Sequence, residues 1–129
     1  MITGDQLLAH AIGDYVIQSH WMANEKVKRW LAAAIHAVTY GLPFLFLRPS
    51  FLAMLVIVGT HAVIDRYRLA RWVVGFRNAV FRPGGAGWGR DLGTPFPPGT
   101  PESLAIWLVI IADNTAHVLL NGLALQYLP

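Results

Sequence analysis

His61-Ala62-Val63-Ile64-Asp65 places a histidine and an aspartate four residues apart at the end of an otherwise apolar run. Residues four apart on a helix share one face, so both side chains are predicted to point to the same place. The same spacing occurs as His10…Asp14 in the first apolar segment and, in reverse order, as Asp113…His117 in the last one. We therefore expect an all-helical protein in which the three pairs meet in space.

The composition is typical of a membrane protein. Of the 129 residues, 55% are hydrophobic and 13% are charged, whereas ordinary soluble domains have roughly 25% charged residues. No nucleic-acid partner is expected, because the basic residues behind the net charge of +3 cluster beside apolar segments. The chain has no cysteine, which excludes disulfides and thiolate metal ligands.

Four segments are apolar and about as long as a bilayer crossing requires, which is roughly 20 helical residues. Thr3 and Gln6 predict a capping box at the start of the first segment, and Ser50 is a predicted N-cap of the third. We predict a single integral-membrane domain, built as a four-helix transmembrane bundle with spans at about 5–21, 30–47, 50–66 and 102–127.

The third helix is predicted to continue beyond the membrane as a basic interfacial extension. Leu69, Trp72, Val73, Phe76 and Val80 recur at helical spacing among several arginines. This pattern is typical of an amphipathic helix at a membrane surface, with anionic lipid headgroups as partners. A loop at 83–101 follows, in which 11 of 19 residues are Pro or Gly.

The basic residues also predict the orientation. One basic group, around Lys28, lies between the first two spans, and a second, from Arg66 to Arg90, lies between the last two. The positive-inside rule makes both regions cytoplasmic, so that both termini lie outside the inner (cytoplasmic) membrane. With this topology, the histidine of each pair lies on the outer side of its aspartate.

Buried charges are costly unless they are paired, so these polar residues must satisfy one another or bind a ligand. Three or four imidazoles with carboxylates suit Zn²⁺, or alternatively Mn²⁺ or Fe²⁺. A metal-free proton or ion pathway and a purely structural polar network are the alternatives. The three aspartates are ligands or catalytic general bases in this interpretation. The predicted metal ligands are His10, Asp14, His36, His61, Asp65, Asp113 and His117.

The segment from Leu7 to Gln18, LLAHAIGDYVIQ, resembles the opening signature of a bacterial and phage integral-membrane family known as domain of unknown function 3307. That family continues with one histidine in its second span, His-x-x-x-Asp in its third and Asp-Gln-x-x-His in its last. This chain matches those elements, with Asn114 in place of the glutamine. The resemblance implies a small multi-pass membrane protein and supplies no activity.

Three functions are compatible with such a site. The first is metal-dependent hydrolysis of a lipid-linked substrate, with the metal activating water and an aspartate acting as general base. The second is a proton- or ion-coupled transporter or channel that uses the same residues. The third is a non-catalytic membrane effector with a structural metal. The sequence does not predict the substrate or the oligomeric state.

Overall fold

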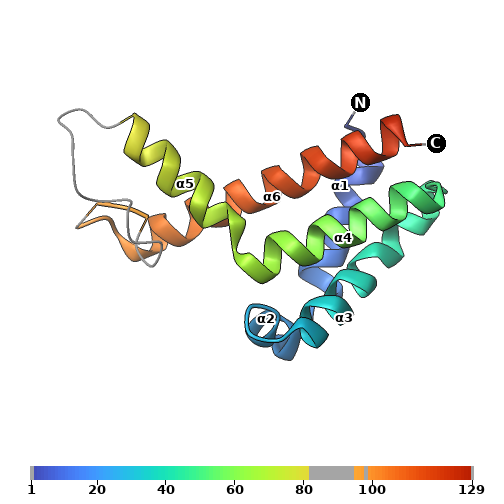
Figure 1. Ribbon diagram of the computed structural model, residues 1–129, viewed down its shortest axis with the longest axis horizontal. Helices are drawn as coiled ribbons and strands as arrows, with labels where there is room; N and C mark the ends of the chain where they lie inside the picture. The colour runs from blue at the N-terminus through green and yellow to red at the C-terminus, as the bar shows by residue number, and fades with distance from the viewer. Residues whose placement is uncertain (1, 82–94, 98, 129) are drawn as a thin grey trace. The chain divides into compact units, whose positions relative to one another are not determined.

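The structure, a computed structural model, describes residues 2–81, 95–97 and 99–128, and these contain helices and no strand (Figure 1). The all-α prediction is therefore confirmed. Most of the predicted Pro/Gly-rich loop at 83–101 lies outside the described residues. The helices, in chain order, are α1 (Gly4–Ala11), the π-helix η1 (Ile12–Ile17), α2 (His20–Glu25), α3 (Trp30–Gly41), the 3₁₀-helix η2 (Leu42–Leu47), α4 (Phe51–Tyr67), α5 (Leu69–Val80) and α6 (Glu102–Tyr127).

The chain forms two compact units. The first contains the described residues up to Tyr67 together with those from Ala116 onward, and the second contains those from Arg68 to Thr115. Helix α6 therefore contributes its C-terminal half to the first unit. The single integral-membrane domain stays a prediction.

Two segments are long and apolar enough to cross a membrane, Trp30–Leu47 with 18 residues and Glu102–Tyr127 with 26. They coincide with the second and fourth predicted spans. Helix α4 has 17 residues, at the lower limit of the usual range for a membrane span. The fold is thus helical with two candidate membrane helices.

The first predicted span, 5–21, is interrupted. Thr3 caps α1 as predicted, because its hydroxyl accepts a hydrogen bond from the Gln6 amide at 3.3 Å. The helix then widens into η1 and ends at Ile17. The physical cause is a second cap, because Ser19 is extended and its hydroxyl accepts from the Met22 amide at 3.2 Å to start α2.

The third predicted segment also differs after its apolar run. Ser50 caps α4 as predicted, since its hydroxyl accepts from the Ala53 amide at 2.9 Å. The same hydroxyl donates to the Leu128 carbonyl at 2.9 Å, which links the start of α4 to the end of α6. The predicted continuation of this helix is wrong, because Arg68 adopts a left-handed conformation with φ of 52° and α5 begins as a separate helix.

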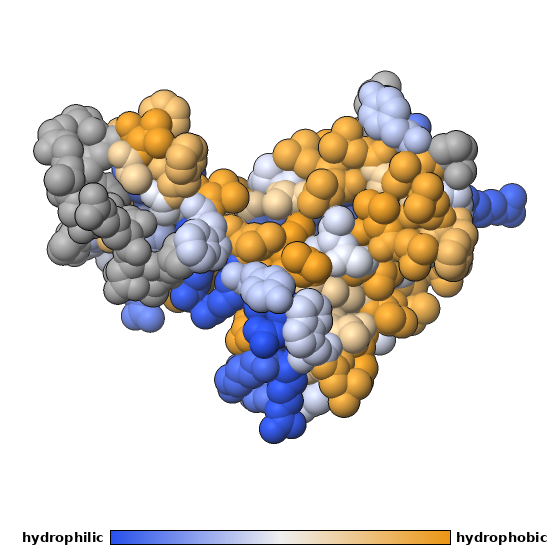
Figure 2. Space-filling view, in the orientation of Figure 1, coloured by the Kyte–Doolittle hydropathy of each residue, from blue (hydrophilic) through white to orange (hydrophobic). Residues whose placement is uncertain are grey.

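The interior of the first unit holds an apolar core around Tyr40, Phe44 and Ile57 together with a set of buried polar residues, and its exterior is apolar. The large side chains of Phe46, Phe51 and Val16 are 90%, 79% and 75% exposed. Figure 2 shows hydrophobic residues over most of the visible face of this unit, with hydrophilic residues gathered near α2. The buried polar residues are Gln6, His10, Asp14, His36, His61, Asp65, His117 and Asn121.

Candidate metal centre

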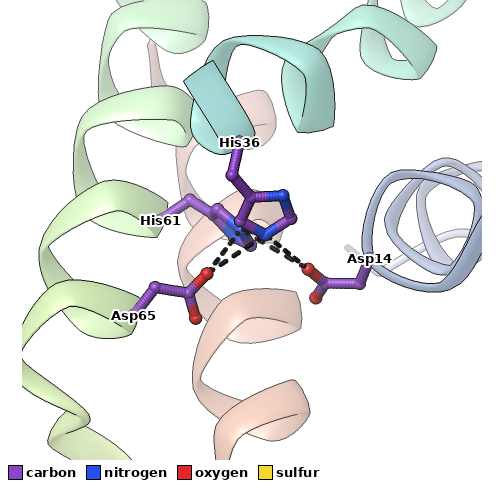
Figure 3. A group of neighbouring side chains, drawn as sticks. All are labelled: Asp14, His36, His61 and Asp65. Atoms are coloured by element: carbon purple, nitrogen blue, oxygen red, sulfur yellow. Dashed lines mark hydrogen bonds and ion pairs between the residues drawn. The ribbon is translucent and has the colours of Figure 1, made fainter. Parts of the chain in front are cut away.

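Four of these buried residues direct their side chains at one point (Figure 3). Asp14 comes from η1, His36 from α3, and His61 and Asp65 from α4. The Nε2 atoms of His36 and His61 lie 2.9 Å apart. The Asp65 Oδ2 atom lies 3.1 Å from His36 Nε2 and 3.2 Å from His61 Nε2. The Asp14 Oδ1 atom lies 3.3 Å and 3.4 Å from the same two nitrogens.

These distances fit the donor set of a tetrahedral metal site. With metal–ligand bonds of about 2.0–2.1 Å, tetrahedral geometry places the donor atoms about 3.3 Å apart. Five of the six distances within the set lie between 2.9 and 3.4 Å. The sixth joins the two carboxylates, whose ligand atoms lie within 4.8 Å of each other. The four residues can therefore hold one metal ion with small adjustments of the aspartates.

Both histidines present the same atom to the cluster. Among the described residues, the Nδ1 atoms of His36 and His61 are buried and have no hydrogen-bond partner. All polar contacts of the two rings are therefore made through Nε2, the atom that faces the carboxylates. Nε2 with its lone pair is a usual ligand atom of histidine in metal sites.

The backbone of η1 brings Asp14 to the cluster. The π-helix is a rare element that occurs mostly as short insertions, often at functional sites. Gly13, the preceding residue, faces α3 so closely that an added Cβ would lie 2.6 Å from the Tyr40 ring and 2.9 Å from the Tyr40 carbonyl oxygen. Glycine at this position therefore allows α3 and η1 to approach, and with them His36 and Asp14.

Replacing Gly13 by alanine is expected to destabilise the protein by about 1–3 kcal/mol, the usual cost of overpacking. The backbone carbonyl of Tyr40 cannot rotate away as a side chain could. Thermal unfolding in detergent measures the effect. Gly59→Ala is the matched control, because an added Cβ at Gly59 meets nothing within 4 Å. Equal melting temperatures for the two variants would contradict the close approach.

Tyr40 joins the cluster to further polar residues. Its ring stacks on His61 with centroids 3.6 Å apart and planes inclined by 10°. Asn121 donates to the Tyr40 hydroxyl at 2.6 Å. The hydroxyl lies 2.8 Å from His10 Nδ1, to which it can donate its own proton. Tyr40 therefore orients the His61 ring and links α1, α3 and α6.

Residues of α1 and α6 complete this interior. The Gln6 side-chain amide donates to the Val118 carbonyl at 2.6 Å, which ties α1 to α6. His117 Nε2 lies 3.6 Å from Asp65 Oδ1, and its ring centroid is 4.2 Å from that of His61. His117 is therefore a neighbour of the four-residue cluster.

Lys26 contributes a positive charge to the cluster. Its ammonium donates to Asp65 Oδ2 at 2.7 Å and to the Gln18 side-chain oxygen at 2.7 Å. It also lies 3.3 Å from His36 Nε2. The lysine side chain is only 16% exposed. Gln18 thus reaches the site through Lys26, although Gln18 lies in the extended connection after η1.

The structure brings together most of the predicted ligands. Asp14, His36, His61 and Asp65 form the cluster, and His117 borders it. His10 is buried beside it, with Nδ1 at 3.6 Å from Asp14 Oδ2. Asp113 lies one turn before His117 on α6, is partly buried and belongs to the second unit. The metal-ligating and catalytic roles of all seven residues stay predictions.

Sequence reasoning missed Lys26, Tyr40, Asn121 and Gln6 as parts of the site. Lys26 belongs to a basic connection that looks like a solvated turn in the sequence. Its contact with Asp65 joins residues 39 positions apart. Tyr40 carried a usable signal, because it follows His36 by four residues and must share its helix face.

Comparison with known proteins supports the family and nothing beyond it. Residues 2–81 match the model of a family described as "Protein of unknown function (DUF3307)". The match includes His10, Asp14, His36, His61 and Asp65 and ends before α6. No curated protein and no solved structure matches the chain. Since the match covers more than half of the sequence, the chain belongs to the DUF3307 family.

Proposed function

We propose that this protein is an integral-membrane protein whose polar interior binds one divalent metal ion. The main support is that the side chains of Asp14, His36, His61 and Asp65 converge on one point. Their donor atoms are about as far from one another as the ligand atoms around a tetrahedral metal ion. Buried carboxylates need positive charge close by, and the single ammonium of Lys26 offsets only one of the two carboxylates. The donor set, made of nitrogen and oxygen without sulfur, suits Zn²⁺, Mn²⁺ or Fe²⁺.

The proposal of a membrane location rests on the exposed apolar side chains of the first unit and on its buried ionisable ones. A soluble protein buries its large apolar side chains and exposes charged ones, whereas here Phe46, Phe51 and Leu31 are exposed and six ionisable side chains are buried. Large exposed apolar surfaces are typical of contacts with membranes or partners. We propose that α3 with η2, α6, α4 and the helix from α1 to η1 lie in the bilayer, the last as a short, partly inserted helix.

The orientation follows from the basic residues. Lys28 and Arg29 lie in the connection before α3 and are exposed, as are Arg68 and Arg77 in or next to α5. We propose that both regions face the cytoplasm and contact anionic headgroups, with both termini on the outer side of the inner membrane. Exposed Trp72, Val73 and Phe76 give α5 an apolar face suited to the membrane surface.

The four-residue donor set favours a structural role for zinc. A tetrahedral Zn²⁺ with four protein ligands has no open position, whereas catalytic zinc keeps one for water. The ion would then hold η1, α3 and α4 together within the lipid bilayer. Mn²⁺ or Fe²⁺ accepts six ligands, which leaves two positions for water and for the hydrolysis of a lipid-linked substrate. The identity of the ion therefore discriminates between an effector with a structural metal and a hydrolase.

Expression in a bacterium followed by fractionation and metal analysis tests both parts. We expect the protein in the membrane fraction after an alkaline wash, and about one equivalent of divalent metal per chain after purification in detergent. Because the chain has no cysteine, Lys28→Cys reports the side of the membrane without background, and we expect a membrane-impermeant thiol reagent to label it only after the cells are opened. Recovery in the soluble fraction would refute the membrane proposal, and membrane protein without metal would refute the metal site.

A further inference from the structure

Lys26 is a largely buried cation whose contacts coincide with those expected of a bound metal. Its ammonium lies 2.7 Å from Asp65 Oδ2 and 3.3 Å from His36 Nε2, two of the four donor atoms of the cluster. Lysine side chains are rarely buried and usually keep their ammonium in water. The position of Lys26 is therefore a specific feature of this site.

Helix α4 holds the lysine in place from two consecutive residues. Asp65 accepts the hydrogen bond of the ammonium, and the neighbouring Arg66 donates to the Val27 carbonyl at 2.6 Å and to the Lys28 carbonyl at 3.3 Å. The Arg66 guanidinium also lies 5.7 Å from the ring centre of Trp30. The turn that carries Lys26 is thus fixed to the helix that carries His61 and Asp65.

Building on the proposed metal site, we propose that Lys26 is a tethered cation that competes with the divalent ion for Asp65. An ion bound to Asp65 Oδ2 and His36 Nε2 would come within a few ångströms of the ammonium. Two like charges at such a distance in a poorly solvated interior repel each other strongly. Binding of the metal therefore requires the ammonium to move away from Asp65, and this opposition lowers the metal affinity and speeds release.

Lys26→Met tests the inference, because it keeps the length of the side chain and removes its charge. Calorimetric titration of the detergent-purified, metal-stripped protein with Zn²⁺ and a competing chelator gives the dissociation constant. We expect Lys26→Met to bind Zn²⁺ at least about tenfold more tightly than the wild type, because the repulsive charge is gone. Lys26→Arg, which keeps the charge, is expected to bind no more tightly than the wild type.

Lys28→Met is the matched control. Lys28 has the same charge, lies in the same turn and pairs with Glu25, but its side chain is 63% exposed and far more solvated. Its loss is expected to change the affinity by less than about threefold, since solvent and salt screen an exposed charge. Should Lys26→Met not fold, Lys26→Gln removes the charge while keeping a hydrogen-bond donor, and the same comparison is made with it.

The outcomes separate this inference from the metal site itself. Tighter binding by Lys26→Met, with Lys28→Met unchanged, supports the competition. Equal or weaker binding by Lys26→Met overturns it and leaves the metal site standing, with Lys26 as a structural partner of Asp65. If neither the wild type nor Lys26→Met binds Zn²⁺, Mn²⁺ or Fe²⁺, the metal site itself is refuted. In that case the ammonium is the permanent counter-ion of the cluster.

Discussion

Asp65→Asn is expected to weaken metal binding by more than about 100-fold, beyond the usual effect of residues that only support a ligand. It is also expected to destabilise the first unit by about 3–5 kcal/mol, the usual cost of breaking a buried ion pair. The oxygens of Asp65 face four side chains, those of Lys26, His36, His61 and His117, at 2.7–3.6 Å. Asparagine carries no negative charge, and its amide hydrogens would point toward groups that need a hydrogen-bond acceptor.

Asp5→Asn is the control for this variant. Asp5 lies in the first turn of α1 and is exposed, so its substitution removes the same charge without touching the cluster. Chelator competition and thermal unfolding in the same detergent measure both effects. A normal metal affinity for Asp65→Asn would show that Asp65 is not a ligand. A normal melting temperature would show that its ion pair with Lys26 contributes little.

His61→Phe is expected to abolish stoichiometric metal binding while the protein remains folded. Phenylalanine keeps an aromatic ring to stack on Tyr40, whose centroid lies 3.6 Å from that of His61. It lacks the Nε2 atom that lies 2.9 Å from His36 Nε2 and 3.2 Å from Asp65 Oδ2. His61→Ala removes the ring as well, and is expected to cost about 2–4 kcal/mol more in stability, through the cavity that it leaves.

The comparison of these two variants separates ligation from packing. His20→Phe is the control, because His20 is exposed and contacts Asn24 rather than the cluster. Metal content per chain and melting temperature are measured for all three. Full metal content in His61→Phe would contradict a role as ligand. Equal stability of His61→Phe and His61→Ala would contradict the contribution of the Tyr40 stack.

The bounds of a helix could be predicted from the sequence where the helix coincides with a long apolar segment. Both candidate membrane helices, 30–47 and 102–127, were predicted with the bounds that the structure gives. The predicted helix at 5–21 failed because a local hydrogen bond at Ser19 competes with the helix. The continuation past Arg68 failed because its left-handed conformation is not encoded by the apolar pattern. At these two boundaries, a local side-chain hydrogen bond and a local backbone conformation therefore outweigh hydropathy.

The site could be predicted to the extent that it depends on spacing within one helix. His61 and Asp65 share a face of α4 as expected, and each lies within 3.4 Å of atoms from other segments. The contribution of Lys26 could not be predicted, because it depends on how a turn folds back onto α4. The close approach at Gly13 likewise depends on the packing of η1 against α3.

X-ray absorption spectroscopy of the purified protein at the metal edge gives the strongest test of the proposed metal site. We predict one divalent ion per chain with only nitrogen and oxygen neighbours, about 2.0–2.2 Å away if the ion is zinc. Outer-shell scattering from two imidazole rings is expected from His36 and His61, and is lost in His61→Phe. Absence of a stoichiometric ion, a sulfur neighbour, or a spectrum that His61→Phe leaves unchanged would contradict it.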